Sequence, residues 1–251
     1  MSGRSSKSKS GRLVFAALIL VFLAGALYAS YNLVTTEVNY NAARVEYFEL
    51  QQRAPILGDP PVETGDTADP AGQNLETHAD LAAINPDYIG WIRIEGTDID
   101  YPLVQGRDNI KYMNTTFMGE RNPSGAIFMD YMCTGFGHFA IIHGHNMRDG
   151  SMFAQLHSFL DRSFRSQYRE ITIITPTGQE LVYYVIEAKL TDISDEIFTL
   201  AEKGRIAVMN YFAAYGFTEE DFQEGIDILT LATCTNNARN ERLVVFAFRH
   251  P

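Results

Sequence analysis

Short stretches of alternating apolar and polar residues dominate the chain from residue 88 onward. Such alternation predicts strands that bury one face, and residues typical of turns separate the stretches. The predicted strands lie at residues 88–94, 99–104, 126–129, 139–142, 170–175, 180–186, 228–235 and 241–248. Helices are predicted at 151–159 and 205–215. Many short strands with few helices favour a mainly β domain with flanking helices, closed or nearly closed into a barrel.

The N-terminal end follows a different pattern. Residues 13–36 carry no charge and are mostly apolar, whereas residues 1–12 hold four basic residues and no acidic one. About twenty apolar residues are enough to cross a bilayer as a helix, and basic residues before the span place the N-terminus in the cytoplasm. The pattern predicts a cytoplasmic basic tail at 1–12 and a transmembrane anchor at 13–36, with the rest of the chain outside the cell. A cleaved signal peptide is the alternative, because Ala24-Gly25-Ala26 resembles a cleavage site.

Helical periodicity continues beyond the apolar run. Residues 35–53 contain neither Pro nor Gly. One face of this predicted helix carries Tyr40, Ala43, Tyr47 and Leu50. The pattern is compatible with a solvated spacer helix and with a helix docked on the domain that follows, and it does not choose between them.

Residues 37–80 as a whole are predicted to join the anchor to a folded domain at 81–251. Within this segment, residues 54–80 contain four prolines and six acidic residues but no Lys or Arg. Such a stretch buries too little apolar surface to fold by itself. It is therefore interpreted as an acidic, Pro-rich linker that follows the membrane-proximal helix.

Composition narrows the classes of function. The formal net charge of −11 argues against a nucleic-acid partner, since phosphate binding needs a basic surface. Two cysteines, Cys133 and Cys234, are too few for a disulfide framework. The sequence holds no Cys-x-x-Cys, His-Glu-x-x-His or calcium-loop motif, so we expect no metal and no cofactor.

Three chemically active side chains stand at predicted strand ends. Cys234 closes one strand, Arg242 stands near the start of the next, and a histidine pair, His143 and His145, follows the strand at 139–142. A thiol, an imidazole and a guanidinium are the groups that acyl transfer requires as nucleophile, proton carrier and oxyanion donor. A lone cysteine after an apolar run is more often a small buried hydrophobe, so the argument depends on the three groups together.

The motifs resemble those of a known family. The run Thr-Leu-Ala-Thr-Cys that ends at Cys234, followed by Arg242, resembles the Thr-Leu-x-Thr-Cys signature of sortases. The run Gly-His-Asn-Met around His145 resembles the histidine motif of class B sortases. The resemblance covers roughly residues 85–250 and implies a closed β-barrel, with the helix at 205–215 as the extra helix of class B members.

The resemblance also implies roles for single residues. Cys234 would be the nucleophile, His145 would protonate the leaving amine, and Arg242 would stabilise the oxyanion. His143 stands where relatives often have an aromatic residue and is interpreted as packing. Thr233 and Asn146 are predicted to contact the substrate.

The implied activity is transpeptidation at the outer face of a Gram-positive cell membrane. The enzyme would cleave a secreted protein after the threonine of a C-terminal sorting signal resembling Asn-Pro-x-Thr-x. The thioester would then pass to an amine of a peptidoglycan precursor or of a pilin lysine. Two alternatives remain open: a cysteine endopeptidase that releases the acyl group to water, and a membrane-tethered binding module without catalysis.

Overall fold

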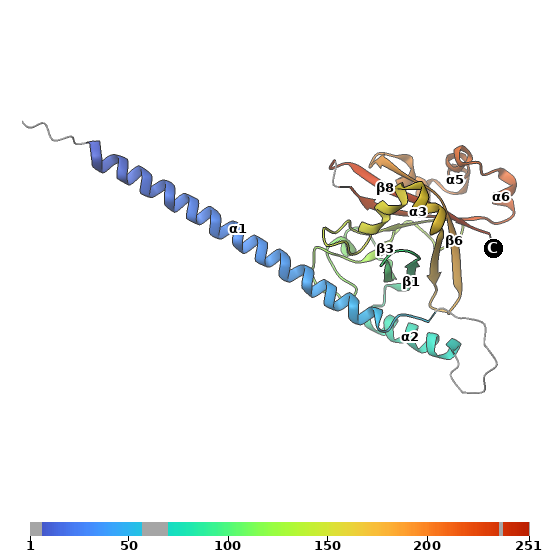
Figure 1. Ribbon diagram of the computed structural model, residues 1–251. Helices are drawn as coiled ribbons and strands as arrows, with labels where there is room; N and C mark the ends of the chain where they lie inside the picture. Colours follow the sequence, from blue (N-terminus) through green and yellow to red (C-terminus); the bar gives the residue numbers. More distant parts are fainter. Residues whose placement is uncertain (1–6, 57–69, 236–237, 251) are drawn as a thin grey trace, which may run out of the picture. The chain divides into compact units, whose positions relative to one another are not determined.

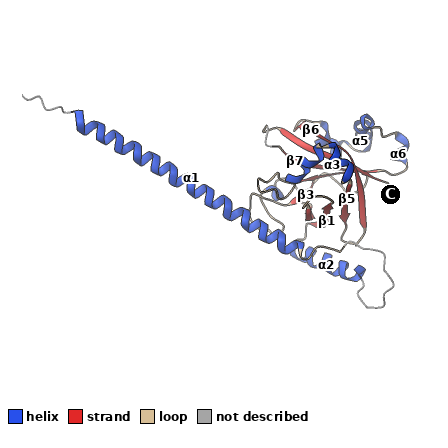
Figure 2. Ribbon diagram, in the orientation of Figure 1, coloured by secondary structure: helices blue, strands red, loops and turns tan. Residues whose placement is uncertain are grey.

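The computed structural model describes residues 7–56, 70–235 and 238–250, and Figures 1 and 2 show it by sequence position and by secondary structure. The chain divides into two compact units, with the boundary between Ala42 and Ala43. Parts of the predicted basic tail (1–12), of the linker (54–80) and of the loop after Cys234 lie outside the described residues.

The first unit is most of a single long helix, α1 (Lys7–Gln51). Its residues from Leu13 onward form a helix long and apolar enough to cross a membrane, with a mean hydropathy of 2.4 in its most apolar window and none of that window buried. The structure thus confirms a helix at the predicted anchor. A signal sequence near the N-terminus is also apolar and helical, so that alternative stays open.

The second unit is built on a closed barrel of the predicted strands. Their bounds are β1 (Tyr88–Ile94), β2 (Asp100–Val104), β3 (Ile127–Met129), β4 (Phe139–His143), β5 (Glu170–Ile174), β6 (Glu180–Asp192), β7 (Asp227–Cys234) and β8 (Glu241–Arg249). Around the barrel the order is β1-β2-β3-β4-β7-β8-β6-β5, and β5 closes it on β1. The predicted mainly β fold is confirmed.

Short helices flank the barrel. They are α2 (Pro70–Ile84), α3 (Arg162–Gln167), α4 (Leu200–Lys203), α5 (Arg205–Phe212), α6 (Glu219–Gln223) and the 3₁₀ helices η1 (Lys111–Met113), η2 (Ala154–Leu160), η3 (Glu196–Thr199) and η4 (Ala213–Tyr215). Together α5 and η4 match the helix predicted at 205–215. The helix predicted at 151–159 forms only as η2, and it starts three residues later, at Ala154.

The last turns of α1 belong to the barrel unit and are docked on it. Ala43, Tyr47 and Leu50 are buried. The Tyr47 hydroxyl donates to the carbonyl of Gly125 at 2.6 Å, and the Gln51 amide donates to the carbonyl of Asp100 at 3.0 Å. Of the two interpretations of the 35–53 helix, the docked one therefore holds for its residues from 43 to 51.

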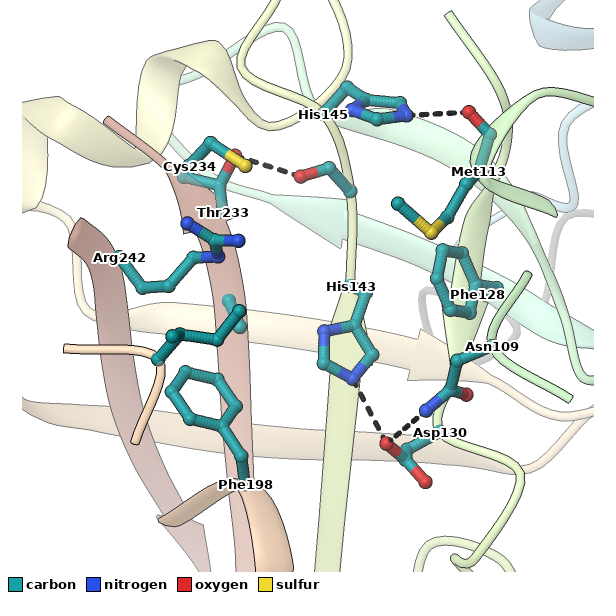
Figure 3. A pocket seen from close by; sticks show the side chains of 13 residues that line it. Asn109, Met113, Phe128, Asp130, His143, His145, Phe198, Thr233, Cys234 and Arg242 are labelled. Atoms are coloured by element: carbon teal, nitrogen blue, oxygen red, sulfur yellow. Dashed lines mark hydrogen bonds and ion pairs between the residues drawn. The ribbon is translucent and has the colours of Figure 1, made fainter. Parts of the chain in front are cut away.

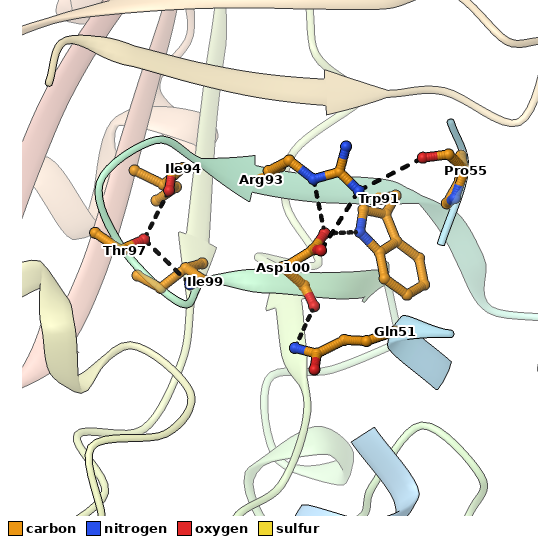
Figure 4. A network of polar contacts seen from close by, with 8 residues as sticks. All are labelled: Gln51, Pro55, Trp91, Arg93, Ile94, Thr97, Ile99 and Asp100. Atoms are coloured by element: carbon orange, nitrogen blue, oxygen red, sulfur yellow. Dashed lines mark hydrogen bonds and ion pairs between the residues drawn. The ribbon is translucent and has the colours of Figure 1, made fainter. Parts of the chain in front are cut away.

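A polar network on β1 and β2 lies next to this helix end (Figure 4). The Asp100 carboxylate accepts from Arg93 Nε at 3.0 Å and from Trp91 Nε1 at 2.5 Å. Arg93 also donates to the carbonyl of Pro55 at 3.5 Å, just after α1 ends. The network ties the chain leaving α1 to the first hairpin of the barrel.

The described part of the predicted linker differs from expectation. Residues 70–84 form α2, so ordered structure begins before residue 81. Pro70 stands at the first helical position, where the missing N–H costs nothing. Further along α2, His78 and Leu81 are almost completely buried. The average composition of residues 54–80 is polar and acidic, so it did not reveal the buried face of α2.

Candidate active site

Strand pairing places Cys234 beside Arg242. In the antiparallel ladder of β7 and β8, Cys234 lies directly opposite Arg242. Opposed residues point to the same face, with Cβ atoms about 4.5–5.5 Å apart. Two residues that are eight positions apart in sequence are thus direct neighbours across the two strands.

The histidine comes from the strand on the other side of β7. In the parallel ladder of β4 and β7, His143 lies opposite Ala232, and β4 ends there. His145 follows two residues later, just past the end of β4, and Cys234 ends β7 two residues beyond Ala232. The parallel register therefore brings the sequence-predicted histidine and cysteine to the same end of the barrel.

Gly144 lets the backbone between the two histidines lie close to two neighbouring side chains. A Cβ atom at this position would lie 2.5 Å from Ile127 and 2.7 Å from Phe153, closer than any side chain permits. The backbone is held from β7, because Gly144 N donates to the carbonyl of Ala232 at 3.2 Å. The Thr233 hydroxyl donates to the carbonyl of Gly144 at 2.8 Å.

All three predicted catalytic residues line one cavity of about 270 Å³ (Figure 3). Its full lining consists of Asn109, Met113, Phe128, Asp130, His143, Gly144, His145, Ile193, Phe198, Ala232, Thr233, Cys234 and Arg242. Apolar side chains from the η1 region, β3 and the segment after β6 form much of the wall. A largely apolar wall around a thiol, an imidazole and a guanidinium suits chemistry on a carbonyl group.

A backbone carbonyl orients His145. Its Nε2 atom lies 2.7 Å from the carbonyl oxygen of Met113 in η1. A carbonyl only accepts hydrogen bonds, so Nε2 carries the hydrogen. The Nδ1 atom is then the ring nitrogen left to exchange a proton with the thiol or with a substrate amine.

Arg242 is held by its own loop. Its Nη1 atom donates to the carbonyls of Arg239 and Glu241, at 3.1 and 3.0 Å. The contact to Arg239 involves only that residue's backbone, and the Arg239 side chain is exposed. Arg249 lies at the far end of β8, where it pairs with Asp227. Of these three arginines, Arg242 is the one that lines the cavity.

The two cysteines have different surroundings. Both are free thiols within the described part of the chain. Burial raises the pKa of Cys133 to about 11, and its sulfur accepts from the backbone N–H of Ile141 at 3.4 Å. Cys234 is half-buried and faces the cavity. A buried thiol with a raised pKa is unreactive, so the geometry favours Cys234 as the nucleophile.

The two predicted substrate contacts are placed differently. Thr233 belongs to the cavity wall, but its hydroxyl is occupied by Gly144. Asn146 is not part of the cavity lining and forms an isolated antiparallel bridge with Met152. A direct contact of either residue with substrate stays a prediction.

Sequence reasoning missed a second polar group in this cavity. His143, interpreted from the sequence as packing, lies with Nε2 3.2 Å from Oδ2 of Asp130, and Asn109 donates to the same oxygen at 2.6 Å. In the sequence, the only indication of this pair is Asp130, the acidic residue directly after the strand predicted at 126–129. Within the described ranges, no three His, Cys, Asp or Glu side chains gather into a metal-binding group. The absence of a cofactor stays a prediction.

Comparison with known proteins agrees with the geometry. The family model of the sortase domain matches residues 92–250. Over 163 residues the chain is 36% identical to sortase B of Listeria monocytogenes, an alignment that covers 63% of this chain and 61% of that protein. It is also 28% identical to sortase B of Staphylococcus aureus over 251 residues, covering 94% and 93% of the two chains.

A solved structure shows the same architecture. A mutant form of Clostridium perfringens sortase B superimposes with a TM-score of 0.69 at 27% identity, covering 82% of this chain and 97% of that one. The similarity thus extends beyond the barrel to part of the N-terminal region. It supports the arrangement of strands on which the cavity depends.

Proposed function

This chain belongs to the sortase family of cysteine transpeptidases, and on that premise we propose that Cys234, His145 and Arg242 carry out acyl transfer from a C-terminal sorting signal to an amine. The observation that carries the proposal is the convergence of these three side chains on one cavity, with Cys234 and Arg242 as a cross-strand pair. Each of them comes from a strand end or from the loop directly after one.

In the first half of the reaction, the Cys234 thiol gives its proton to His145, and the resulting thiolate attacks the carbonyl carbon of the signal's threonine. The oxygen gains negative charge, and the Arg242 guanidinium donates hydrogen bonds to it. The carbon–nitrogen bond then breaks, and the leaving amine takes a proton from His145. The products are a thioester on Cys234 and the released C-terminal peptide.

In the second half, an amine attacks the thioester carbonyl. The carbon–sulfur bond breaks, the thiolate leaves, and the proton of the attacking amine returns to His145. The new bond is an amide, so the sorted protein becomes joined to the acceptor. The acceptor that we propose is an amine of a peptidoglycan precursor or of a pilin lysine.

The helix at 13–36 has a role in this proposal. Its length and apolar character support a single-pass anchor that keeps the catalytic domain at the outer face of the membrane. Membrane fractionation of the full chain tests the anchor, with N-terminal sequencing of the mature protein. An N-terminus directly after Ala26 would instead establish cleavage as a signal peptide.

The decisive experiment follows the acyl-enzyme. The full chain in detergent is incubated with a peptide of the form Asn-Pro-x-Thr-x, and the thioester is detected by mass spectrometry with and without triglycine. Cys234→Ala should form no thioester, whereas the matched variant Cys133→Ala should keep it. Amide formed with triglycine supports the transpeptidase. Release to water at the same rate with or without triglycine would favour the endopeptidase, and a wild type without thioester would favour the binding module.

A further inference from the structure

A second imidazole stands in the cavity, and the proposed reaction does not use it. The ring of His143 packs on Phe128, its partner residue across β3 and β4, with centroids 5.2 Å apart. Its Nε2 atom faces Asp130 at 3.2 Å. The side chain stays 22% exposed. It lies on the cavity wall (Figure 3). The ring is therefore fixed on one face and at one nitrogen, while it remains accessible to a ligand.

Asp130 is itself firmly held. Its Oδ1 atom accepts from the backbone N–H of Met132 at 2.9 Å, and its Oδ2 atom accepts from Asn109 at 2.6 Å. Burial alone would raise the pKa of Asp130, but the hydrogen bonds from His143, Met132 and Asn109 outweigh it and lower the pKa. The carboxylate is therefore ionised at neutral pH and acts only as an acceptor.

This partner fixes the hydrogen on the His143 ring. An ionised carboxylate beside Nε2 requires an N–H there, so the neutral ring presents Nδ1 as a bare acceptor. Within the described part of the chain, Nδ1 has no hydrogen-bond partner. A ligand that fills the cavity displaces water from this atom, and a hydrogen-bond donor on the ligand then offsets the loss.

The position of His143 separates it from the reacting atoms. It stands level with Ala232, two residues before Cys234 on the neighbouring strand. Two residues of strand span about 6.6 Å. His143 is thus set back from Cys234 along the sheet, where it suits a side chain of the bound peptide away from the scissile bond.

The other cavity walls indicate the kind of donor. Met113, Phe128, Ile193 and Phe198 make the surroundings of His143 largely apolar. The charge of Asp130 is already compensated by three hydrogen bonds. A neutral donor therefore fits this environment better than an ammonium group, which would lose its hydration without a free counter-charge.

We propose that His143 is a specificity-determining residue whose Nδ1 accepts a hydrogen bond from a side-chain amide of the bound sorting peptide, with Asp130 as its positioning residue. The inference rests on the proposed function, because it requires a peptide that acylates Cys234. It assigns to this chain a polar contact at a position where the sortase resemblance implies aromatic packing.

A double-mutant cycle between enzyme and peptide tests the contact. The side-chain amide of the Asn-Pro-x-Thr-x peptide is removed by replacing its Asn with Leu, an apolar side chain of similar size. His143→Phe keeps the ring packed on Phe128 and removes both nitrogens. His157→Phe is the matched control, since His157 is a half-buried histidine outside the cavity lining.

For the full chain in detergent, we expect replacement of one amide to lower kcat/KM about five- to thirty-fold in the wild type and in His157→Phe, as loss of one hydrogen bond does. In His143→Phe the same replacement should change kcat/KM less than about twofold, because the acceptor is already gone. A merely structural role would slow both peptides equally and show no coupling.

Asp130→Asn provides a second test if His143→Phe is poorly folded. Both oxygens of Asp130 accept hydrogen bonds, from Met132 at Oδ1 and from Asn109 and His143 at Oδ2, so the new amide leaves at least one of these donors without its acceptor. The carboxylate that fixes the hydrogen on Nε2 of His143 is then gone, so the preference for the amide peptide should weaken. Equal amide dependence in wild type and both variants, with thioester still forming, would overturn the inference and leave the proposed function intact. If no peptide forms a thioester with the wild type, both the inference and the proposed function are refuted.

Discussion

Removing one hydroxyl from Tyr47 should destabilise the barrel unit, because this hydroxyl joins the end of α1 to the loops beside the active site. It donates to the carbonyl of Gly125 at 2.6 Å and accepts from the N–H of Phe117 at 3.3 Å. The ring packs edge-on against Tyr101 and is buried. In Tyr47→Phe the ring stays in place, but a buried carbonyl and a buried N–H both lose their partner.

The expected cost follows from these two groups. Each unsatisfied buried polar group costs about 1–3 kcal/mol, so the loss of both bonds should lower the free energy of unfolding by about 2–6 kcal/mol. For a unit of this size, each kcal/mol lowers the melting temperature by about 2–4 °C, which gives a decrease of roughly 4–24 °C. Tyr184→Phe is the matched control, because the Tyr184 ring is 41% exposed and surface changes typically stay within about 0.5 kcal/mol.

Urea denaturation of the full chain in detergent measures this change. The single tryptophan, Trp91, is fully buried in β1, so its emission reports unfolding of the barrel unit. Equal stability of Tyr47→Phe and Tyr184→Phe would refute the reasoning. It would mean that the end of α1 does not dock on the barrel in solution.

Three further outcomes are expected. Arg242→Ala and Arg242→Lys should both lower turnover by about two or more orders of magnitude, because lysine lacks the planar set of donors. Arg239→Ala should stay within a few-fold of the wild-type turnover, since only the carbonyl of Arg239 is used. A large loss of turnover in Arg239→Ala would reverse the assignment. Burial lowers the pKa of His78, so the unfolded chain binds a proton that the folded chain does not, and stability should fall as the pH drops below about 6.5. Urea titrations between about pH 8 and pH 5 should show this dependence weakened in His78→Phe, and an unchanged slope would contradict it. Thr233→Val removes the hydrogen bond from the hydroxyl to the carbonyl of Gly144 and should lower kcat/KM about three- to thirtyfold in the peptide assay. Unchanged kinetics would show that this bond does not position the backbone next to His145.

The sequence by itself determined the features that depend on local pattern. Alternation of apolar and polar residues predicted the barrel strands, because each strand buries one face wherever it lies in the sheet. The uncharged run after a basic tail predicted the helix at 13–36, since length and hydropathy are properties of the segment alone. The candidates Cys234, His145 and Arg242 were found because short motifs surround each of them. The structure brings all three to one cavity, while their catalytic roles stay predictions.

Only the tertiary structure decided how distant segments meet. Asp130 reaches His143 through the register of β3 and β4, and no local pattern specifies which residues of two strands lie opposite each other. Tyr47 is buried because of loops some 70 residues later in the chain, so its periodicity alone allowed both a docked and a solvated helix. Residues 70–80 fold into α2 although their composition is that of a linker, because the barrel supplies the apolar surface that covers His78 and Leu81. Burial and long-range pairing depend on the partner segment as much as on the residue itself. The linear sequence does not show where that partner segment lies in space.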